Sequence, residues 1–534
     1  MQIQWNPELA RLSQTVQIDG RAYRTYGDLP RSLYHTLEQS AARFPERLAL
    51  ADEVRQLSFG QFKREVDAVA WALQTRFGIR HGDICAFLMY NSVDYCVCCY
   101  AALKLGAIVL PLSTKLQTAE LEYPICNSKA KILFIEKKWE EKVLSLLSKS
   151  EITDVIFSGE APPGACSVSE LVACGEGEAK DAARWSDGAL LMYTSGTTGM
   201  PKGAYINHFG ALHAVESYRL LLGLNERDST VLSIPITYVT GMIGVAFTML
   251  ASGGSIYLHR VFSAEQTARC IQEHQLTFLH GSPTVFSHLL SVWEHSHNAP
   301  NRLLCACGSA SLPERILNGL YRVVPELDLR IVYGLTETCS PATLMPMDSR
   351  KLGKPRSCGI PIPGMEVRLT NCGEYEEGAG ELQVRGSTVI PRYWRPSAEY
   401  ASPFCDGWFD TGDIARLDKD GCLYILDRKK DMINCGGEKV YSIEVENALS
   451  SYPAVAECAV TAMHDQVKLE VPCAFVRFRP GMSASAEQLE VFLADRLAKF
   501  KLPKRYVFLE TFPLGKSGKT LKRQLATQYL GSSN

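Results

Sequence analysis

The first two-thirds of the chain alternates short apolar runs with segments of helical periodicity, and this rhythm limits the fold more than any other feature. Phe62, Val66, Val69 and Leu73 recur at helical spacing after the capping-box pattern Ser58-Phe-Gly-Gln61. Runs typical of buried strands are Ile84–Tyr90, Ile132–Ile135, Val155–Phe157, Ile256–His259 and Thr277–His280. Alternating strands and helices predict layered, parallel α/β architecture.

From about residue 365 the sequence pattern changes from alternating strands and helices to short strands and turns. Met365–Thr370 and Glu381–Gly386 are short runs of alternating polarity with Gly-rich turns, which predict an antiparallel or barrel-like β subdomain. The charged run Lys429-Lys-Asp431 indicates a domain boundary. Because 534 residues are too many for one core, we expect a large domain at 1–426 and a small α+β domain at 427–534.

Composition excludes several classes of function. Lys and Arg total 56 against 58 for Asp and Glu, so no basic excess indicates nucleic acid binding. No apolar run reaches the roughly 18–20 residues of a membrane span, and the N-terminus does not resemble a secretory signal. The 18 cysteines lack the two spaced Cys-x-x-Cys pairs of a zinc site, which favours free thiols in a reducing cytoplasm.

The segment Tyr193-Thr-Ser-Gly-Thr-Thr-Gly-Met-Pro-Lys-Gly-Ala204 is the strongest functional signal. It follows the strand-like run Ala189–Met192, and its glycines, hydroxyls and single lysine are suited to holding phosphate. It is not a Walker loop, because Met200 and Pro201 separate Gly199 from Lys202. A flexible surface loop is the alternative, which the preceding strand and the following lysine disfavour.

The segment resembles the phosphate loop of the adenylate-forming superfamily, in its acyl- and aryl-CoA synthetase branch. Further motifs of that family follow in order: Tyr333-Gly-Leu-Thr-Glu-Thr338, Trp408-Phe-Asp-Thr-Gly-Asp413, Asp427-Arg-Lys-Lys-Asp-Met-Ile433, Gly436-Gly-Glu-Lys-Val-Tyr-Ser-Ile-Glu-Val-Glu446 and Ser517-Gly-Lys519. The resemblance implies an ATP- and Mg²⁺-dependent enzyme that joins a carboxylic acid to AMP and then transfers the acyl group to coenzyme A.

The resemblance also implies residue roles. The β- and γ-phosphates would be held by the phosphate-loop residues Thr194, Ser195, Gly196, Thr197, Thr198, Gly199 and Lys202. Adenine would lie between two segments, Tyr333 with Gly334 and Gly308 with Ser309 and Ala310. The ribose side of the nucleotide would contact Asp413 and Arg428. Thr336 would donate to the α-phosphate, and Glu337 would bind Mg²⁺. Lys519 would catalyse adenylation, and Gly437 would line the pantetheine channel. Lys430 would be the hinge about which a mobile small domain turns. Lys516 and Lys522 lie near Lys519, and the preceding Ser517-Gly518 favours Lys519.

The acid pocket is expected around Tyr238, Gly241 and Thr338. Relatives often carry a histidine where this chain has Tyr238, and a Gly-Tyr-Trp motif where it has Arg392-Tyr-Trp394. No charged partner for a second charge or an amine stands out, which favours a fatty or aromatic monocarboxylic acid. The alternatives are an acyl-AMP ligase that loads a carrier protein, a luciferase and a non-catalytic nucleotide-binding relative. The sequence allows a homodimer.

Overall fold

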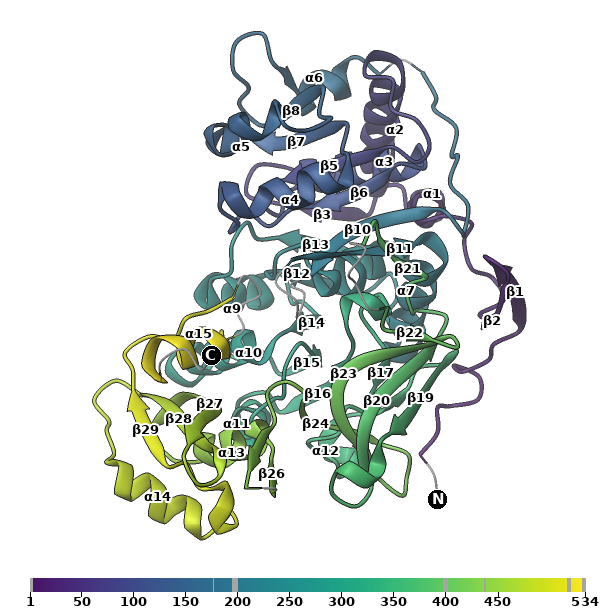
Figure 1. The fold of residues 1–534 in the computed structure, drawn as a ribbon. Helices are drawn as coiled ribbons and strands as arrows, with labels where there is room; N and C mark the ends of the chain where they lie inside the picture. The colour runs from purple at the N-terminus through teal and green to yellow at the C-terminus, as the bar shows by residue number, and fades with distance from the viewer. Residues whose placement is uncertain are drawn as a thin grey trace.

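The computed structural model describes residues 3–175, 177–194, 200–396, 402–436, 438–515 and 520–530, and these form a large N-terminal and a smaller C-terminal α/β domain (Figure 1). The expected mixed α/β class is therefore confirmed. Two large sheets dominate the N-terminal domain, with helices between and around them (Figure 1).

The first large sheet has eight strands among the described residues and a parallel centre. Its antiparallel edge carries the strands that flank the phosphate-loop motif. In spatial order the strands are β21 (Arg392–Trp394), β11 (Lys202–Asn207), β10 (Gly188–Thr194), β6 (Ile108–Pro111), β5 (Ile84–Leu88), β7 (Ile132–Glu136), β8 (Asp154–Ser158) and β9 (Cys166–Ser167).

The second large sheet has nine strands within the described ranges and is parallel from β16 to β3. In spatial order they are β18 (Ile360–Pro361), β17 (Thr343–Leu344), β16 (Glu326–Tyr333), β15 (Arg302–Cys307), β14 (Phe278–Gly281), β12 (Ser229–Leu232), β13 (Ser255–Leu258), β3 (Leu48–Ala51) and β4 (Gln56–Ser58). The predicted strand runs all lie in these two sheets, as the apolar runs indicated.

Helices begin where the sequence supplies caps. Ser58 and Gln61 form the predicted capping box at the start of α2 (Phe59–Arg76). α3 (Val93–Lys104) is buried along almost its whole length, which explains its apolar composition and its buried cysteines. The other helices of this domain are α1 (Leu33–Arg43), α4 (Thr118–Ser128), α5 (Glu140–Leu147), α6 (Val168–Ala173), α7 (His208–Leu222), the π-helix η2 (Thr240–Phe247), α8 (Thr248–Ala251), α9 (Ala264–Glu273), α10 (Pro283–Ser296), α11 (Glu314–Val323) and α12 (Ser349–Leu352).

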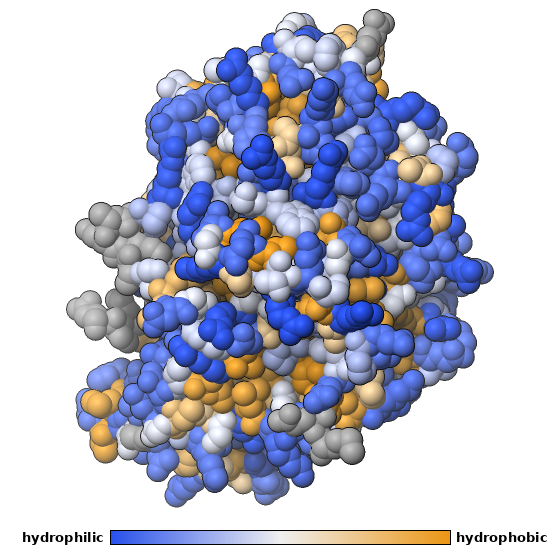
Figure 2. Space-filling model, turned by 90° about the vertical axis from the view of Figure 1, so that its right-hand side faces the viewer, coloured by the Kyte–Doolittle hydropathy of each residue, from blue (hydrophilic) through white to orange (hydrophobic). Residues whose placement is uncertain are grey.

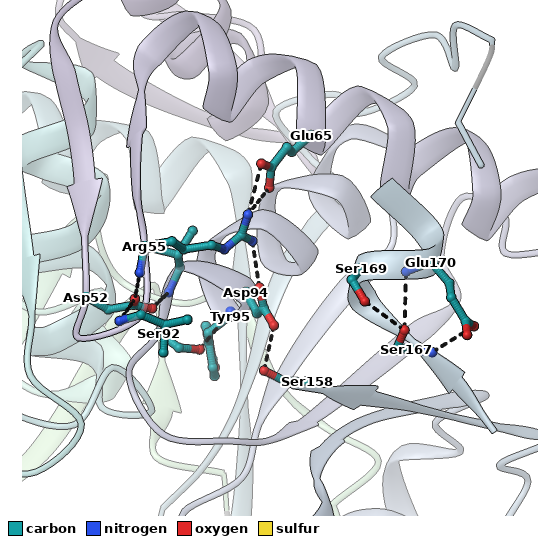
Figure 3. Close-up of polar contacts among 12 residues, drawn as sticks. Asp52, Arg55, Glu65, Ser92, Asp94, Tyr95, Ser158, Ser167, Ser169 and Glu170 are labelled. Atoms are coloured by element: carbon teal, nitrogen blue, oxygen red, sulfur yellow. Dashed lines mark hydrogen bonds and ion pairs between the residues drawn. The ribbon is translucent and has the colours of Figure 1, made fainter. Parts of the chain in front are cut away.

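A polar cluster fastens the two large sheets to the helices between them (Figure 3). Arg55, before β4, donates to Glu65 on α2 and to Asp94 on α3, at 2.7 and 2.6 Å. Asp94 in turn accepts from Ser158 at the end of β8, at 2.7 Å. Arg55 is thereby linked to both sheets, so its role is structural.

The antiparallel subdomain lies where the change of sequence pattern predicted it. Its strands are β19 (Met365–Thr370), β20 (Ala379–Gly386), β22 (Phe404–Cys405), β23 (Trp408–Leu417) and β24 (Leu423–Arg428). β23 pairs with β20, β22 and β24, and a separate hairpin, β1 (Gln14–Ile18) with β2 (Arg21–Thr25), lies at the edge of the molecule (Figure 1).

The small domain surrounds its own apolar core, which includes Val445, Val460 and Leu489. A five-stranded sheet in the described part contains β25 (Ile433–Cys435), β26 (Glu438–Val440), β27 (Val455–Asp465), β28 (Leu469–Phe478) and β29 (Arg505–Phe508). Its helices are α13 (Ser442–Ser450), α14 (Ala486–Ala494) and α15 (Lys522–Leu530). The boundary between residues 426 and 427 stays a prediction.

The surface is mainly polar. On the side that carries β1 and β2, hydrophilic residues cover most of the surface (Figure 2). Patches of hydrophobic residues lie near the middle and in the lower half of this view. Within the described ranges, no helix is both long and apolar enough to cross a membrane. All 18 cysteines are free thiols, as expected.

Candidate active site

The hairpin of β10 and β11 brings the ends of the phosphate-loop motif to the candidate site. Thr194 and Lys202 lie opposite each other in the antiparallel register. The predicted phosphate ligands Ser195, Gly196, Thr197, Thr198 and Gly199 lie outside the described residues. The Thr194 hydroxyl donates to Glu337 Oε1 at 3.4 Å, so this hairpin contacts the motif that follows β16.

Glu337 lies in a short 3-10 turn, η3 (Thr336–Thr338), just beyond β16. The phenol of Tyr393 donates to Glu337 Oε1 at 2.7 Å, and the Ile390 N–H donates to the Glu337 carbonyl at 2.9 Å. The glutamate is only partly buried. Its carboxylate is therefore oriented by neighbours yet accessible, as a magnesium ligand must be.

A complete cage for a metal would need more carboxylates than this turn supplies. The part of the chain that the structure describes holds no group of three or more His, Cys, Asp or Glu side chains able to enclose an ion. Mg²⁺ prefers to keep water and phosphate oxygens beside one or two carboxylates. Glu337 therefore fits Mg²⁺ bound together with a nucleotide.

Lys202 supplies one of the positive charges of this region. Its ammonium lies 5.9 Å from the centre of the Tyr393 ring. Burial lowers the pKa of Lys202, and the charge of Glu337 opposes this shift. A cation and the candidate metal-binding carboxylate thus lie close enough to interact, next to the phosphate-loop motif.

Tyr333, Asp413 and Arg428 form a second polar group. The Tyr333 phenol donates to Asp413 Oδ2 at 2.6 Å, and Arg428 Nε lies 2.7 Å from Asp413 Oδ1. Burial and the Asp413 charge raise the pKa of Tyr333 well above its ordinary value. Burial alone would lower the pKa of Arg428, but Asp413, Tyr333 and Glu337 outweigh it and raise that pKa.

The strand register explains this second group. Asp413 on β23 and Arg428 on β24 are paired residues, so their side chains share one face of the antiparallel sheet. Asp413 is 2 % exposed. Because each carboxylate oxygen has two lone pairs, Asp413 can accept ribose hydroxyls in addition to its protein partners.

Two glycines permit the close approach of these segments. A Cβ on Gly334 would lie 1.4 Å from the Ser340 carbonyl oxygen, because the chain folds back directly onto it. A Cβ on Gly308 would lie 3.1 Å from the Val332 carbonyl oxygen. Gly308, Ser309 and Ala310 follow β15 and therefore lie beside the end of β16, near Tyr333.

Two of the expected acid-binding residues, Tyr238 and Gly241, lie before and on the π-helix η2, and the third, Thr338, lies in η3. Gly241 is buried, and a Cβ there would lie 2.4 Å from the Pro235 carbonyl oxygen. Burial raises the pKa of Tyr238, which keeps the phenol neutral. Thr338 is also buried, but its hydroxyl accepts the Leu335 N–H at 2.9 Å and so serves the η3 turn.

The predicted hinge and small-domain residues fall at different places. Lys430 is exposed and lies two residues after the end of β24, in a turn where the Asp431 and Met432 N–H groups donate to the Arg428 carbonyl. Gly437 and Lys519 lie outside the described residues. The roles assigned to these three residues stay predictions.

Sequence reasoning missed two side chains. Tyr393 belongs to the Arg392-Tyr-Trp motif, which received no role, yet it holds Glu337. His280 lies at the carboxyl end of β14, and its Nδ1 lies 3.1 Å from where a Cβ on Gly244 would be. Burial lowers the pKa of His280 to about 4, so it is neutral at physiological pH. Ligands of α/β sheets bind at this edge, which is the signal that could have identified it.

Two models of known protein families match this chain. The model of the AMP-binding enzyme family matches residues 37–394, and that of the AMP-binding enzyme C-terminal domain matches residues 444–519. Together they include β10, β11 and η3 of the large domain and most of α13.

Individual relatives are similar over nearly their whole length. The chain is 34 % identical to a 2-succinylbenzoate–CoA ligase of Bacillus licheniformis, covering 92 % of this chain and 98 % of the relative. It is 31 % identical to a long-chain-fatty-acid–CoA ligase of Mycobacterium tuberculosis, covering 85 % and 90 %. A solved o-succinylbenzoate coenzyme A synthetase of Bacillus subtilis, in complex with ATP and magnesium ion, aligns with a TM-score of 0.78 at 29 % identity, covering 92 % and 98 %.

Proposed function

Because the chain belongs to the AMP-binding enzyme family, we propose that it is an AMP-forming acid–CoA ligase. It would activate a monocarboxylic acid with ATP, giving an acyl-adenylate and pyrophosphate. Attack of the coenzyme A thiol would then form the thioester and release AMP. Relatives named as 2-succinylbenzoate and long-chain-fatty-acid CoA ligases support this reaction class.

One observation carries the proposal. Motifs far apart in sequence meet around Glu337, which contacts Thr194 and Tyr393 and lies close enough to Arg428 to affect its pKa. This arrangement places a carboxylate, a cation and hydroxyl donors around one site, beside a buried aspartate suited to ribose. These are the groups that bringing a carboxylate anion up to a phosphate anion requires.

The first step would use both sides of this site. Lys202 and the phosphate loop would hold the β- and γ-phosphates, and Glu337 would hold Mg²⁺. Thr336 would donate to the α-phosphate, while Tyr333 would stack on adenine opposite residues 308–310. Asp413 and Arg428 would bind the ribose.

The small domain would supply the remaining groups in turn. Lys519 would neutralise charge between the acid carboxylate and the α-phosphate. A unit charge pair at about 4 Å is worth roughly 4 kcal/mol at an effective dielectric of 20. Rotation about Lys430 would then replace Lys519 with the segment after Gly436, where Gly437 would leave room for pantetheine.

The acid is proposed to be a fatty or aromatic monocarboxylate. Tyr238, Gly241 and Thr338 carry no charge, and the nearby His280 is neutral at physiological pH. A second carboxylate or an amine buried there would lack a charged partner, which is costly. The free thiols of the chain fit a reducing compartment such as the cytoplasm.

Pyrophosphate release tests the proposal. The panel is octanoate, palmitate, benzoate, phenylacetate, indoleacetate and 2-succinylbenzoate, each with ATP and Mg²⁺ and with or without coenzyme A. We expect release with at least one monocarboxylate, together with coenzyme A-stimulated AMP formation. Release at background with every acid would contradict the enzymatic function.

The same assay separates the rival functions. An acyl-AMP ligase would release AMP faster with a carrier protein than with coenzyme A. A non-catalytic relative would bind ATP without releasing pyrophosphate. Preference for 2-succinylbenzoate, a dicarboxylate, over all monocarboxylates would contradict the proposed acid class and leave the reaction class intact.

A further inference from the structure

A chain of hydrogen bonds, half of it buried, connects the candidate nucleotide-binding strand β24 to the first residue of helix α15. It consists of Asp427, Ser442, Lys522 and Glu446, which we call the β24–α15 chain. The Ser442 N–H donates to Asp427 Oδ2 at 2.5 Å, and the Ser442 hydroxyl donates to Asp427 Oδ1 at 3.1 Å. The Lys522 ammonium donates to the Ser442 hydroxyl at 2.6 Å and pairs with Glu446 Oε1 at 2.6 Å.

Two members of the β24–α15 chain are removed from water, and the other two, Lys522 and Glu446, are partly exposed. Asp427 is 1 % exposed and Ser442 is fully buried. Burial alone would lower the pKa of Lys522, but Glu446 and Asp427 outweigh it and raise that pKa. Glu446 Oε1 also accepts the Val460 N–H at 2.8 Å, which joins the β24–α15 chain to the small-domain sheet.

The two ends of the β24–α15 chain belong to different parts of the molecule. Asp427 follows the predicted boundary at residue 426, but it lies on β24, which pairs with β23, so it is held by the sheet of the large domain, next to Arg428 and its partner Asp413. Ser442 begins α13, and α13 packs into the small-domain core through Val445. Lys430 lies between Asp427 and Ser442 in sequence, so rotation about Lys430 would move the two partners relative to each other.

Lys522, at the other end of the β24–α15 chain, is close in sequence to Lys519. Lys522 is the first residue of α15 and lies three positions after Lys519. Leu514 and Thr520 flank the segment that contains Lys519, and an antiparallel bridge joins them. Fixing α15 against β24 therefore also fixes Thr520 and Lys522, which closely follow Lys519 in the sequence.

We propose that the β24–α15 chain is a latch between the domains, and that Lys522 is the residue that positions Lys519 for adenylation. The proposal rests on the proposed function. The latch holds α13 and α15 of the small domain against the strand that carries Arg428. The second step requires the other pose, so the latch must open before the thiol attacks.

Ser442→Ala is the sharpest test. It removes the hydroxyl that links Lys522 to Asp427. The Ser442 N–H bond to Asp427 and the Lys522–Glu446 pair stay, so the variant weakens the latch at one defined bond. Ser451→Ala, at the exposed end of α13, is the matched control. We expect Ser442→Ala to slow pyrophosphate release about tenfold, because a hydrogen bond between charged or buried groups is lost. The acid is the best one of the panel above.

Thioester formation from the synthetic adenylate of that acid separates positioning from simple damage. We expect Ser442→Ala to retain or exceed the unmodified rate in this second step. Lys522→Met should lose adenylation more severely, and Lys522→Arg should restore part of it. An equal loss in both steps, with a lowered melting temperature, would overturn the latch and indicate a merely structural cluster.

Trypsin provides a readout that needs no activity. Lys429 and Lys430 are exposed and lie at the proposed hinge. An opened latch should make Ser442→Ala more sensitive to cleavage there than Ser451→Ala, and equal sensitivity would contradict the latch. An unmodified protein that releases no pyrophosphate would disprove the proposed function, while the cleavage result would still decide whether the domains are latched.

Discussion

The nucleotide side and the acid side of the candidate site are built in opposite ways. On the nucleotide side, polar side chains from distant motifs bind one another: Tyr333 and Arg428 hold Asp413, and Tyr393 holds Glu337. On the acid side, the shape comes from backbone packing. Gly241 lies against the Pro235 carbonyl, and Gly244 lies against His280.

This difference separates chemistry from specificity. A site for ATP needs fixed charges, and fixed charges need partners that orient them before the ligand binds. A pocket for an apolar acid needs the right volume, and backbone and small residues set that volume. We therefore expect changes on the nucleotide side to alter ATP and Mg²⁺ dependence, and changes on the acid side to alter the choice of acid.

The largest effect should come from Lys519, because the nucleotide side is incomplete until the small domain adds its charge. We expect Lys519→Ala to slow adenylation about a thousandfold, from the loss of roughly 4 kcal/mol of charge stabilisation. Single-turnover pyrophosphate release measures this step. Lys516→Ala is the control, and thioester formation from a synthetic acyl-adenylate should remain within a few-fold. Equal loss in the two steps would contradict the two-pose mechanism.

Asp413→Asn should give the next largest effect. The change removes the carboxylate that pairs with Arg428 and that we assign to the ribose. Loss of a charged hydrogen bond is worth about 1.5–3 kcal/mol, so the KM for ATP should rise roughly ten- to a hundredfold. Steady-state kinetics with ATP and the acid varied separately measure it. A comparable rise in the KM for the acid would contradict the separation of nucleotide binding from acid binding.

Gly241→Ala tests the acid side. Its methyl group would lie 2.4 Å from the Pro235 carbonyl oxygen, so the backbone around η2 must shift. We expect a melting temperature lowered in line with about 1–3 kcal/mol of overpacking, and an altered preference across the acid panel. The KM for ATP should stay within about twofold. Gly373→Ala, where a methyl group meets no atom within 4 Å, is the matched control.

The fold was largely predictable because its signals are local. Apolar runs placed strands such as β5 and β14, and Ser58 with Gln61 placed the start of α2. The meeting of Thr194 with Glu337 could not be derived from spacing, because 143 positions separate them, and it was expected only from family resemblance. Tyr393 and His280 were missed because their roles depend on which strand ends become neighbours.

The smallest effect should come from Tyr393→Phe, which tests whether Tyr393 orients the Glu337 carboxylate on the nucleotide side. The change removes the 2.7 Å hydrogen bond to Glu337 and retains the ring that packs in the core. A single hydrogen bond contributes about 1 kcal/mol, so the Mg²⁺ concentration giving half-maximal adenylation should rise about fivefold.

Tyr321→Phe is a matched control for that experiment, because Tyr321 makes a similar 2.7 Å bond to Asp348 in another part of the large domain. Tyr393→Phe loses its phenol-to-carboxylate bond to Glu337. Tyr321→Phe loses the same kind of bond together with the contacts of its hydroxyl to Ser349 and to the Arg350 N–H, so it should lose at least as much thermal stability. Only Tyr393→Phe should change the Mg²⁺ titration, since only its carboxylate partner is assigned to the metal. An unchanged Mg²⁺ requirement would mean that Tyr393 supports the fold around Glu337 without orienting its carboxylate.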